Sequence, residues 1–419
     1  MKALFFLAML ASVAPAVAAD LQTASLAVNQ LGLDLLPRAG ASADNILLSP
    51  YSIQVALAMT YAGAGGATRA EMSRVLHFPA DDATLHASFA ALAQAFADAV
   101  TQQHQRNERL HRFSGHGDTI ELRVANRLFG QRGYEFRAPF LDVLKTTYAA
   151  PLEALNFRRD PEAARRHINE WVEAQTAKKI LDLIPSGGLT EYTRLVLTNA
   201  LYFKAPWERP FDQAATAELP FHIQGGAPQA VPTMRKQFSL PYAKYDGFTA
   251  VALPYAGRDL QFLILLPDVP DGLAALENTI TPELLAGCST MSSQLVALEL
   301  PKFKLQPPTL PLGAALQALG LKTAFDQPRG SANFDRMAPR KPDDYLFIGE
   351  VFHMTFLALD EEGTEAAAAT AVAMLTLSAV EQGSPPQPIV VKVDRPFLFA
   401  IQHCGSGACL FLGRVTDPR

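Results

Sequence analysis

Strand-like apolar runs fill much of the chain from residue 121 onward, and their order is the feature that most constrains the fold. Helical segments occur among them without a regular βαβ rhythm, and no GxGxxG motif joins a strand to a helix. The pattern therefore predicts an α+β fold. The expected strands cover residues 121–130, 193–203, 260–267, 295–305 and 353–359, and the runs IVVKVDRPFLFAIQHC and ACLFLGRV close the chain as a hairpin.

Helices are expected mainly in the N-terminal part. Residues 52–62 have apolar side chains at helical spacing, and residues 68–71 read as a capping box that opens another helix. Asp160-Pro161-Glu162 combines an N-cap, a first-turn proline and an acid at the positive end of the helix dipole. No segment rich in Pro, Gly or Ser divides the chain, so we expect one large domain over residues 19–419.

The first residues, MKALFFLAMLASVAPAVAAD, have the pattern of a signal peptide. Lys2 precedes an apolar run, and Ala16-Val17-Ala18 matches the small residues that signal peptidase accepts. This predicts cleavage after residue 18 and a secreted or periplasmic protein. The alternative is a buried or membrane-spanning helix, although the run is short and contains Pro15.

Charge and composition exclude some classes of partner. The chain has 419 residues, a net charge of −5 and 49% hydrophobic residues, which is enough apolar material for a large core. Nucleic-acid recognition normally needs a clustered basic surface, so we expect no nucleic-acid partner. No later stretch reads as a membrane span, and we expect a monomer.

Three cysteines leave an odd thiol. Cys404 and Cys409 flank the turn residues 405–408, so they form a candidate disulfide across a hairpin. The alternative is that both are small buried residues, while Cys288 is expected to stay free.

Motifs for catalysis or metal binding are weak. Gly405-Ser406-Gly407 lacks the context of a nucleophilic serine, and Gly63-Ala64-Gly65-Gly66 has no GK[ST] ending. The polar residues 101–119 hold His104, His111 and His116, but their spacing matches no strong ligand pattern, and a solvated loop is the better interpretation. We expect no catalytic residues, no cofactor and no metal.

The segment EEGTEAAAATAVAMLTLSAV, residues 361–380, is unusual in a densely folded chain. It has four consecutive alanines, no proline and no aromatic ring, and Gly363 can act as a pivot. As a strand, it would turn Thr364, Ala366, Ala368, Thr370, Val372 and Met374 to one side and the intervening residues to the other. Its small side chains would let it enter an existing sheet, whereas local propensity alone favours an alanine-rich helix.

This segment and its surroundings resemble the serpin family. The resemblance covers NILLSPYSIQVALAMTYAGAGGATRAEM, NRLFGQRGYEF, INEWVEAQTAKKILDLI, LVLTNALYFKAPWERPF, VDRPFLFAI and LFLGRVTDP, in the family's order. It implies three β-sheets with about nine helices and an exposed reactive-centre loop at about residues 361–388. A target protease cleaves such a loop, which then inserts into the main sheet as a new strand and traps the protease as a covalent acyl-enzyme.

The resemblance also implies roles for individual residues. The family's usual spacing from Gly363 places the scissile bond at Leu377-Ser378, which suits chymotrypsin-, cathepsin-, elastase- or subtilisin-like proteases. The segment SAVEQGSPPQP is longer than usual and leaves this register open; the alternative function is a non-inhibitory chaperone or binding protein. The resemblance implies a hinge formed by Glu361, Glu362, Gly363, Thr364, Glu365, Ala366, Ala367, Ala368, Ala369 and Thr370. It implies a shutter, the hydrogen-bonded group under the centre of the main sheet where strands part for insertion, formed by Ser49, Ser52, Asn199 and His353. It also implies that Trp207 lies in the breach, the top of that sheet where insertion begins.

Overall fold

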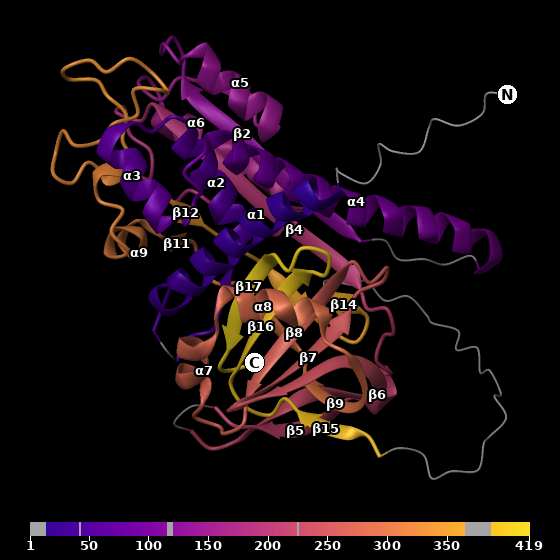
Figure 1. Cartoon of the computed structure of the whole chain (residues 1–419). Helices are drawn as coiled ribbons and strands as arrows, with labels where there is room; N and C mark the ends of the chain where they lie inside the picture. The colour runs from indigo at the N-terminus through magenta and orange to yellow at the C-terminus, as the bar shows by residue number, and fades with distance from the viewer. Residues whose placement is uncertain (1–13, 42, 115–119, 224–225, 365–386) are drawn as a thin grey trace, which may run out of the picture.

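The structure is a computed structural model that describes residues 14–41, 43–114, 120–223, 226–364 and 387–419 (Figure 1). Helices and strands are mixed as predicted, so the α+β expectation is confirmed. The helices in the described part of the chain are α1 (Ala14–Leu35), α2 (Pro50–Ala62), α3 (Gly66–Val75), α4 (Asp82–Ser114), α5 (Ala138–Thr147), α6 (Pro161–Gln175), α7 (Leu273–Thr279), α8 (Pro282–Gly287) and α9 (Gly313–Ala318).

Short polar side chains cap the N-terminal ends of α2 and α6. The Oδ1 atom of Asp160 accepts a hydrogen bond of 2.8 Å from the N–H of Ala163, which confirms the predicted start of α6. Ser49 caps α2, which carries Pro50 in its first turn. The capping box expected at residues 68–71 is wrong, because α3 begins earlier, at Gly66, and the hydroxyl of Thr68 accepts a bond from Asn333 instead.

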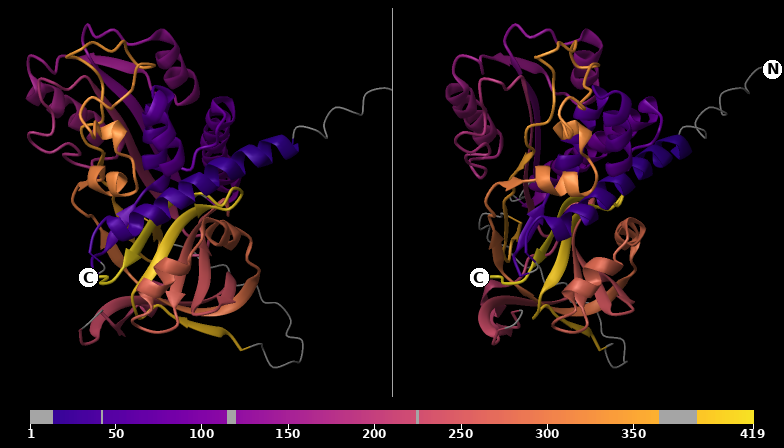
Figure 2. Two further views of the ribbon diagram at one scale, coloured as in Figure 1. Left: turned by 60° about the vertical axis from the view of Figure 1, so that its left-hand side comes forward. Right: turned by 90° about the vertical axis from the view of Figure 1, so that its left-hand side faces the viewer.

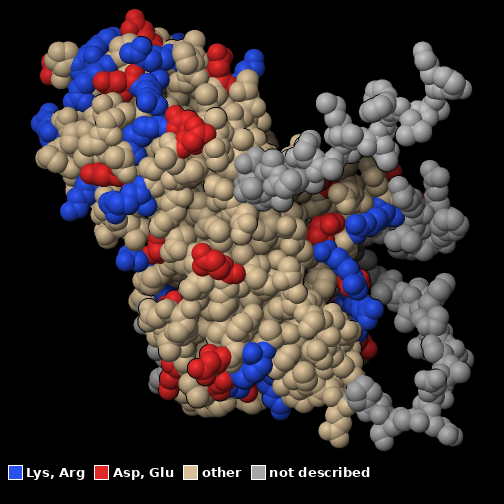
Figure 3. Space-filling model, viewed as in Figure 1, with Lys and Arg blue, Asp and Glu red and all other residues tan. Residues whose placement is uncertain are grey.

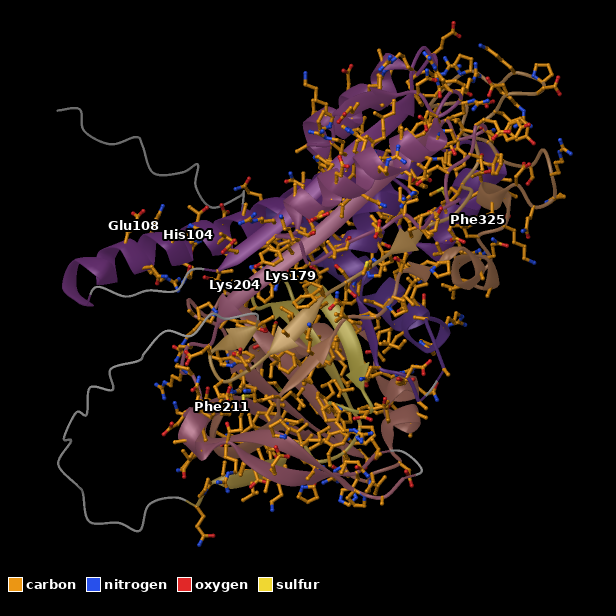
Figure 4. All side chains as sticks on the ribbon, turned by 180° about the vertical axis from the view of Figure 1, so that it is seen from behind. His104, Glu108, Lys179, Lys204, Phe211 and Phe325 are labelled. Carbon is orange, nitrogen blue, oxygen red and sulfur yellow. The ribbon has the colours of Figure 1, made fainter. Side chains whose placement is uncertain are left out.

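The polar segment expected as a loop at residues 101–119 is also corrected. Helix α4 continues to Ser114 and projects from the body of the molecule, and Figure 4 shows His104 and Glu108 on this projecting part. The Nε2 atom of His104 lies 3.0 Å from the carbonyl oxygen of Ile120, so its ring ties α4 to the chain just before the next strand.

Among the described residues, the strands form one six-stranded sheet, one nine-stranded sheet and one strand pair. The six-stranded sheet, called the main sheet below, has the order β10-β13-β14-β4-β2-β3. Its strands are β2 (Glu121–Gln131), β3 (Leu152–Leu155), β4 (Leu195–Pro206), β10 (Phe303–Leu305), β13 (Leu357–Leu359) and β14 (Gly363–Thr364).

The nine-stranded sheet has the order β1-β17-β16-β8-β7-β6-β9-β15, with β5 paired to β6. The predicted closing hairpin is present as β16 and β17, and β11 pairs with β12 in the separate pair. The bounds are β1 (Ile46–Leu48), β5 (Ala217–Phe221), β6 (Gln229–Tyr245), β7 (Phe248–Pro254), β8 (Leu260–Pro267), β9 (Ser293–Pro301), β11 (Leu310–Pro311), β12 (Phe352–His353), β15 (Ile389–Lys392), β16 (Phe397–His403) and β17 (Cys409–Val415).

Helices cover both faces of the main sheet (Figures 1 and 2). Helix α2 packs beneath β4 as part of the large core, whereas α6 packs on the opposite face. Phe129 of β2 and Val196 of β4 are directly opposite each other and contribute to the second core under α6. Residues next to them along β4 therefore face α2, which fixes the inner and outer faces of the sheet.

Candidate functional site

The short strand β14 is the only part of the reactive-loop segment that the structure describes in the main sheet. Gly363 pairs with Pro206 and Thr364 with Ala205 of β4, and Thr364 also pairs with Leu359 of β13. Both neighbours run antiparallel to β14. The described hinge residues Gly363 and Thr364 thus already lie between two strands, at the point where further residues would have to enter.

A tight turn of residues 360–363, called the hinge turn below, leads from β13 into β14. The N–H of Asp360 donates to the carbonyl oxygen of Gly363 at 3.0 Å, which closes the turn. The carboxylate Oδ1 of Asp360 accepts bonds from the N–H groups of Glu362 at 2.9 Å and Gly363 at 3.2 Å. Any Cβ at position 363 would overlap the carbonyl oxygen of Ala205, so this position requires glycine.

Trp207, the predicted breach residue, holds the hinge turn from the side of β4. Its indole Nε1–H donates to the carbonyl oxygen of Asp360 at 2.9 Å, and its backbone N–H donates to the carbonyl oxygen of Glu362 at 2.8 Å. The indole is buried and stacks on the ring of Tyr255, with 4.7 Å between ring centroids and 13° between ring planes. The structure therefore places Trp207 in direct contact with the hinge.

Tyr255 connects this aromatic stack to the inserted end of the hinge. Its hydroxyl lies 2.5 Å from the hydroxyl of Thr364, and both side chains are fully buried. Burial raises the pKa of Tyr255, so the phenol stays protonated and can share a hydrogen bond with Thr364. Tyr255 belongs to the site although the sequence analysis did not identify it.

Glu361 is a buried acid with two partners. Its side chain accepts bonds from the Thr216 hydroxyl at 2.7 Å and from the Lys302 ammonium group at 2.8 Å. Burial alone would raise the pKa of Glu361, but the bonds from Lys302 and Thr216 outweigh burial and lower it. The backbone oxygen of Glu361 also accepts a bond from the N–H of Phe211 at 2.8 Å. Glu361 is therefore bonded to Phe211, to Thr216 just before β5 and to Lys302 between β9 and β10.

Three of the four predicted shutter residues meet beneath the main sheet. The N–H of Ser49 donates to Nε2 of His353 at 3.0 Å, and the Ser49 hydroxyl donates to the carbonyl oxygen of Leu410 at 2.7 Å. The N–H of Ser52 donates to Oγ of Ser49 at 3.3 Å. Burial lowers the pKa of His353 to about 4, which keeps its ring neutral and Nε2 available as an acceptor. Asn199 lies in β4 opposite Asn126, and its side chain is outside the described residues.

A cavity of about 670 Å³, called the sheet cavity below, opens below the shutter. One wall is the first part of β4, residues 195–198, and the other is the segment 345–353 that ends at His353. Its floor is α2, from which Ile53, Ala56 and Leu57 contribute apolar side chains. The sheet cavity therefore shares one wall with β14, because β4 borders both.

Several predicted site residues fall outside the described part of the chain. These are the remaining hinge residues Glu365, Ala366, Ala367, Ala368, Ala369 and Thr370, and the scissile bond Leu377-Ser378. By contrast, the structure shows three residues bonded to the hinge that the sequence analysis did not identify: Lys302, Thr216 and Tyr255. Lys302 precedes a strand in the run LVALELPKFKL, and no local pattern indicated that it pairs with an acid far along the chain.

The candidate disulfide is corrected by the structure, in which all three cysteines are free thiols. The register of β16 and β17 pairs Cys409 with Gln402, so the hairpin does not bring Cys404 opposite Cys409. Burial raises the pKa of Cys404 to about 12 and that of Cys288 to about 11, so both are protonated near neutral pH. Within the described residues, no three His, Cys, Asp or Glu side chains gather to bind a metal ion.

The charged side chains give no single-sign surface on the face shown in Figure 3, where basic and acidic groups are interspersed. The main sheet holds the hinge strand β14 between β13 and β4, and the sheet cavity lies further along β4. The family model for "Serpin (serine protease inhibitor)" matches residues 26–418. The chain belongs to the serpin family, whose members are protease inhibitors rather than enzymes.

Individual relatives agree with this assignment. A serpin-like protein of Thermococcus kodakarensis is 36% identical over 403 residues, covering 94% of this chain and 85% of the relative. The leukocyte elastase inhibitor of Bos taurus is 37% identical over 386 residues, covering 90% of this chain and 94% of the relative. The native crystal structure of the thermophilic serpin tengpin matches with a TM-score of 0.77 and 26% identity, over 95% of this chain and 94% of that one.

The prediction of a secreted or periplasmic protein is wrong. The leukocyte elastase inhibitor and the related serpins that the chain matches are intracellular serpins. None of the helices built from described residues has the length and apolar character that a membrane span requires.

Proposed function

We propose that this serpin is an irreversible suicide-substrate inhibitor of serine proteases. The observation that carries the proposal is the position of Thr364, which lies between β4 and β13 with its side chain in the core. A loop cleaved further along could continue from Thr364 as a full strand.

The register of β14 determines how such a strand would lie. Continued along β4, it would place Glu365 opposite Lys204, Thr370 opposite Asn199 and Met374 opposite Leu195. Continued along the other neighbour, it would place Thr370 beside His353. A strand with one partner on each edge satisfies its backbone donors and acceptors on both sides. The ten backbone N–H groups of residues 365–374 alone would contribute roughly 10 kcal/mol at about 1 kcal/mol per hydrogen bond.

Side-chain size along the loop supports this register. Because the Thr364 side chain faces the core, alternation would turn Ala366, Ala368, Thr370, Val372 and Met374 inward. The small residues would pass over the crowded part of β4 around the buried Phe203. Val372 and Met374 would reach the level of residues 195–198, where the sheet cavity offers about 670 Å³. Burying a methionine contributes about 1.5–3 kcal/mol.

Insertion would disable a protease that is still attached to the loop. About 13 residues at ~3.3 Å each would carry the protease on the order of 40 Å. Hydrolysis of the acyl-enzyme requires an aligned catalytic triad and oxyanion hole, and a displacement of ~1 Å already costs ~100-fold in rate. Compression of the protease against the body of the inhibitor therefore preserves the ester bond.

The choice of target follows from the residue before the scissile bond. Leu377 suits a hydrophobic primary pocket, which favours chymotrypsin-, cathepsin-, elastase- or subtilisin-like enzymes over trypsin-like ones. The name of the bovine relative, leukocyte elastase inhibitor, supports a target in this group.

A denaturing gel tests the proposal. Incubation with chymotrypsin or subtilisin should give a covalent band of the summed mass, and protease blocked at its catalytic serine should give none. Cleavage without that band would mean that the chain is a substrate and would favour the non-inhibitory alternative. Clipping of the loop should also raise the melting temperature, because insertion makes the cleaved form more stable, and an unchanged melting temperature would contradict loop insertion.

A further inference from the structure

The hinge turn has a feature that the family assignment does not explain. Asp360 uses both its backbone and its side chain within one turn: its N–H and its carboxylate Oδ1 make three bonds to Glu362 and Gly363. Its carbonyl oxygen accepts the indole N–H of Trp207 as well. The first three of these bonds lie within the hinge turn, residues 360–363, and the fourth comes from β4's neighbour Trp207.

The geometry of insertion explains why this turn matters. Strand β14 runs antiparallel to β13, so the chain must reverse its direction between Leu359 and Thr364. Any loop that enters the sheet beside β13 as an antiparallel strand needs this reversal first. Forming a reversal from a free chain costs backbone entropy before the first ladder bond forms. A turn that is already closed removes that cost from the insertion step.

We propose that Asp360 is a positioning residue for loop insertion, because its carboxylate closes the reversal that delivers Gly363 and Thr364 into the sheet. This inference rests on the proposed inhibitory function. In the described structure, Asp360 bonds to Glu362, Gly363 and Trp207. It acts through the backbone of Glu362 and Gly363, which directs the following residues downward between β4 and β13 instead of away from the sheet.

The neighbouring charged groups are consistent with an acceptor role. Burial raises the pKa of Asp360 while the two amide bonds oppose this rise, and Glu361 and Lys302 are the charged groups that act on it. Lys302 is paired with Glu361 at 2.8 Å. The contacts that the structure gives the Asp360 carboxylate are backbone N–H groups, so an uncharged acceptor of the same shape should replace it.

The first experiment compares Asp360→Ala with Asp360→Asn in an inhibition titration against chymotrypsin. Asp360→Ala removes the acceptor, and each lost hydrogen bond corresponds to roughly a fivefold change in the population of the turn. We therefore expect the number of inhibitor molecules consumed per protease to rise severalfold. Asp360→Asn keeps an acceptor oxygen and should remain near wild type. Asp212→Ala is the matched control, because Asp212 also caps a backbone N–H, that of Ala214, but lies outside the hinge turn.

A second measurement does not depend on inhibition. The chain has two tryptophans, Trp171 and Trp207, so a Trp171→Phe background leaves Trp207 as the only indole beside the hinge turn. Opening of the turn frees its indole N–H, and acrylamide quenching of Trp207 should rise in Asp360→Ala but not in Asp360→Asn. Far-UV circular dichroism at the same temperature confirms that each variant is folded.

The outcomes separate the two proposals. If the wild type forms no covalent complex with any protease tested, the inhibitory function fails, while the quenching comparison still tests the turn. If the wild type inhibits and Asp360→Ala has the same stoichiometry, the positioning role is wrong. Equal defects in Asp360→Ala and Asp360→Asn would overturn the acceptor argument, and so would equal quenching in all variants.

Discussion

The hydroxyl groups of Tyr255 and Thr364 lie 2.5 Å apart under the main sheet, and this contact sets which face of the hinge enters the core. Tyr255 is fixed by its stack on Trp207 and by an edge contact with Phe203. Thr364 therefore meets a rigid aromatic surface with one polar atom in reach. Because side chains alternate along a strand, this one contact determines the orientation of every later residue of an inserted loop.

Replacement of Thr364 by arginine should convert the inhibitor into a substrate. The side chain is fully buried, and a buried charge without a partner costs several kcal/mol. The loop would still be cleaved, but insertion would be too slow to trap the acyl-enzyme. A gel with chymotrypsin should show cleaved protein and no covalent band, whereas Thr101→Arg, at an exposed threonine on α4, should inhibit normally. Full inhibition by Thr364→Arg would contradict the requirement that the side chain at position 364 stay buried and uncharged during insertion.

Replacement of Leu377 by arginine should shift inhibition from chymotrypsin to trypsin. Trypsin-like enzymes select Arg or Lys through an acid at the base of the primary pocket. The second-order rate constants of complex formation with the two enzymes measure the shift. If both constants stay unchanged, the scissile bond lies elsewhere in the loop, and N-terminal sequencing of the released fragment would locate it.

His353 should make the native protein less stable as the solution is acidified. Burial lowers its pKa to about 4 in the folded protein, while the ordinary value near 6.5 applies to the unfolded chain. Between these values the unfolded state binds more protons, so stability is complete above about pH 6.5 and falls toward pH 4. The full effect is on the order of 3 kcal/mol. Urea unfolding at pH 7 and pH 4.5 measures this loss.

The matched variant for this pH effect is His353→Gln, compared with the wild type. It lacks the titrating ring and should lose less stability between the two pH values. An identical pH dependence in wild type and His353→Gln would rule out the buried shutter histidine as its source.

Local patterns predicted the elements whose causes are local. The N-cap at Asp160, the apolar strand runs and the closing hairpin depend on residues close in sequence, and the structure has them as expected. The capping box expected at residues 68–71 failed because a residue far along the chain, Asn333, uses the Thr68 hydroxyl. Propensity alone did not reveal that competition.

Site residues that belong to a family motif could be predicted from the sequence. Site residues that reach the hinge only through tertiary packing could not. The family resemblance singled out Trp207, Ser49 and His353, and the structure shows their contacts: Trp207 bonds to the hinge turn, and Ser49 bonds to His353. The partners that give these residues their function come from distant segments: the Tyr255 and Thr364 hydroxyls are 109 residues apart in sequence. Such contacts depend on the packing of whole sheets against each other, and local patterns in the sequence do not indicate which distant residues will meet.

Adjacent alanines in the loop should respond in opposite ways to the same substitution. In the proposed register, Ala366 would turn inward beside the buried Phe203, and Ala367 would turn outward opposite Tyr202. Arg123 lies over the ring of Tyr202, with 5.6 Å between its guanidinium carbon and the ring centroid, so an acid at 367 would meet a cation near solvent. Ala366→Asp should therefore raise the stoichiometry of inhibition severalfold and reduce the gain in melting temperature on cleavage. Ala367→Asp should change both little; a reversed order would show that the inserted strand is shifted by one residue, because a one-residue slip exchanges the two faces.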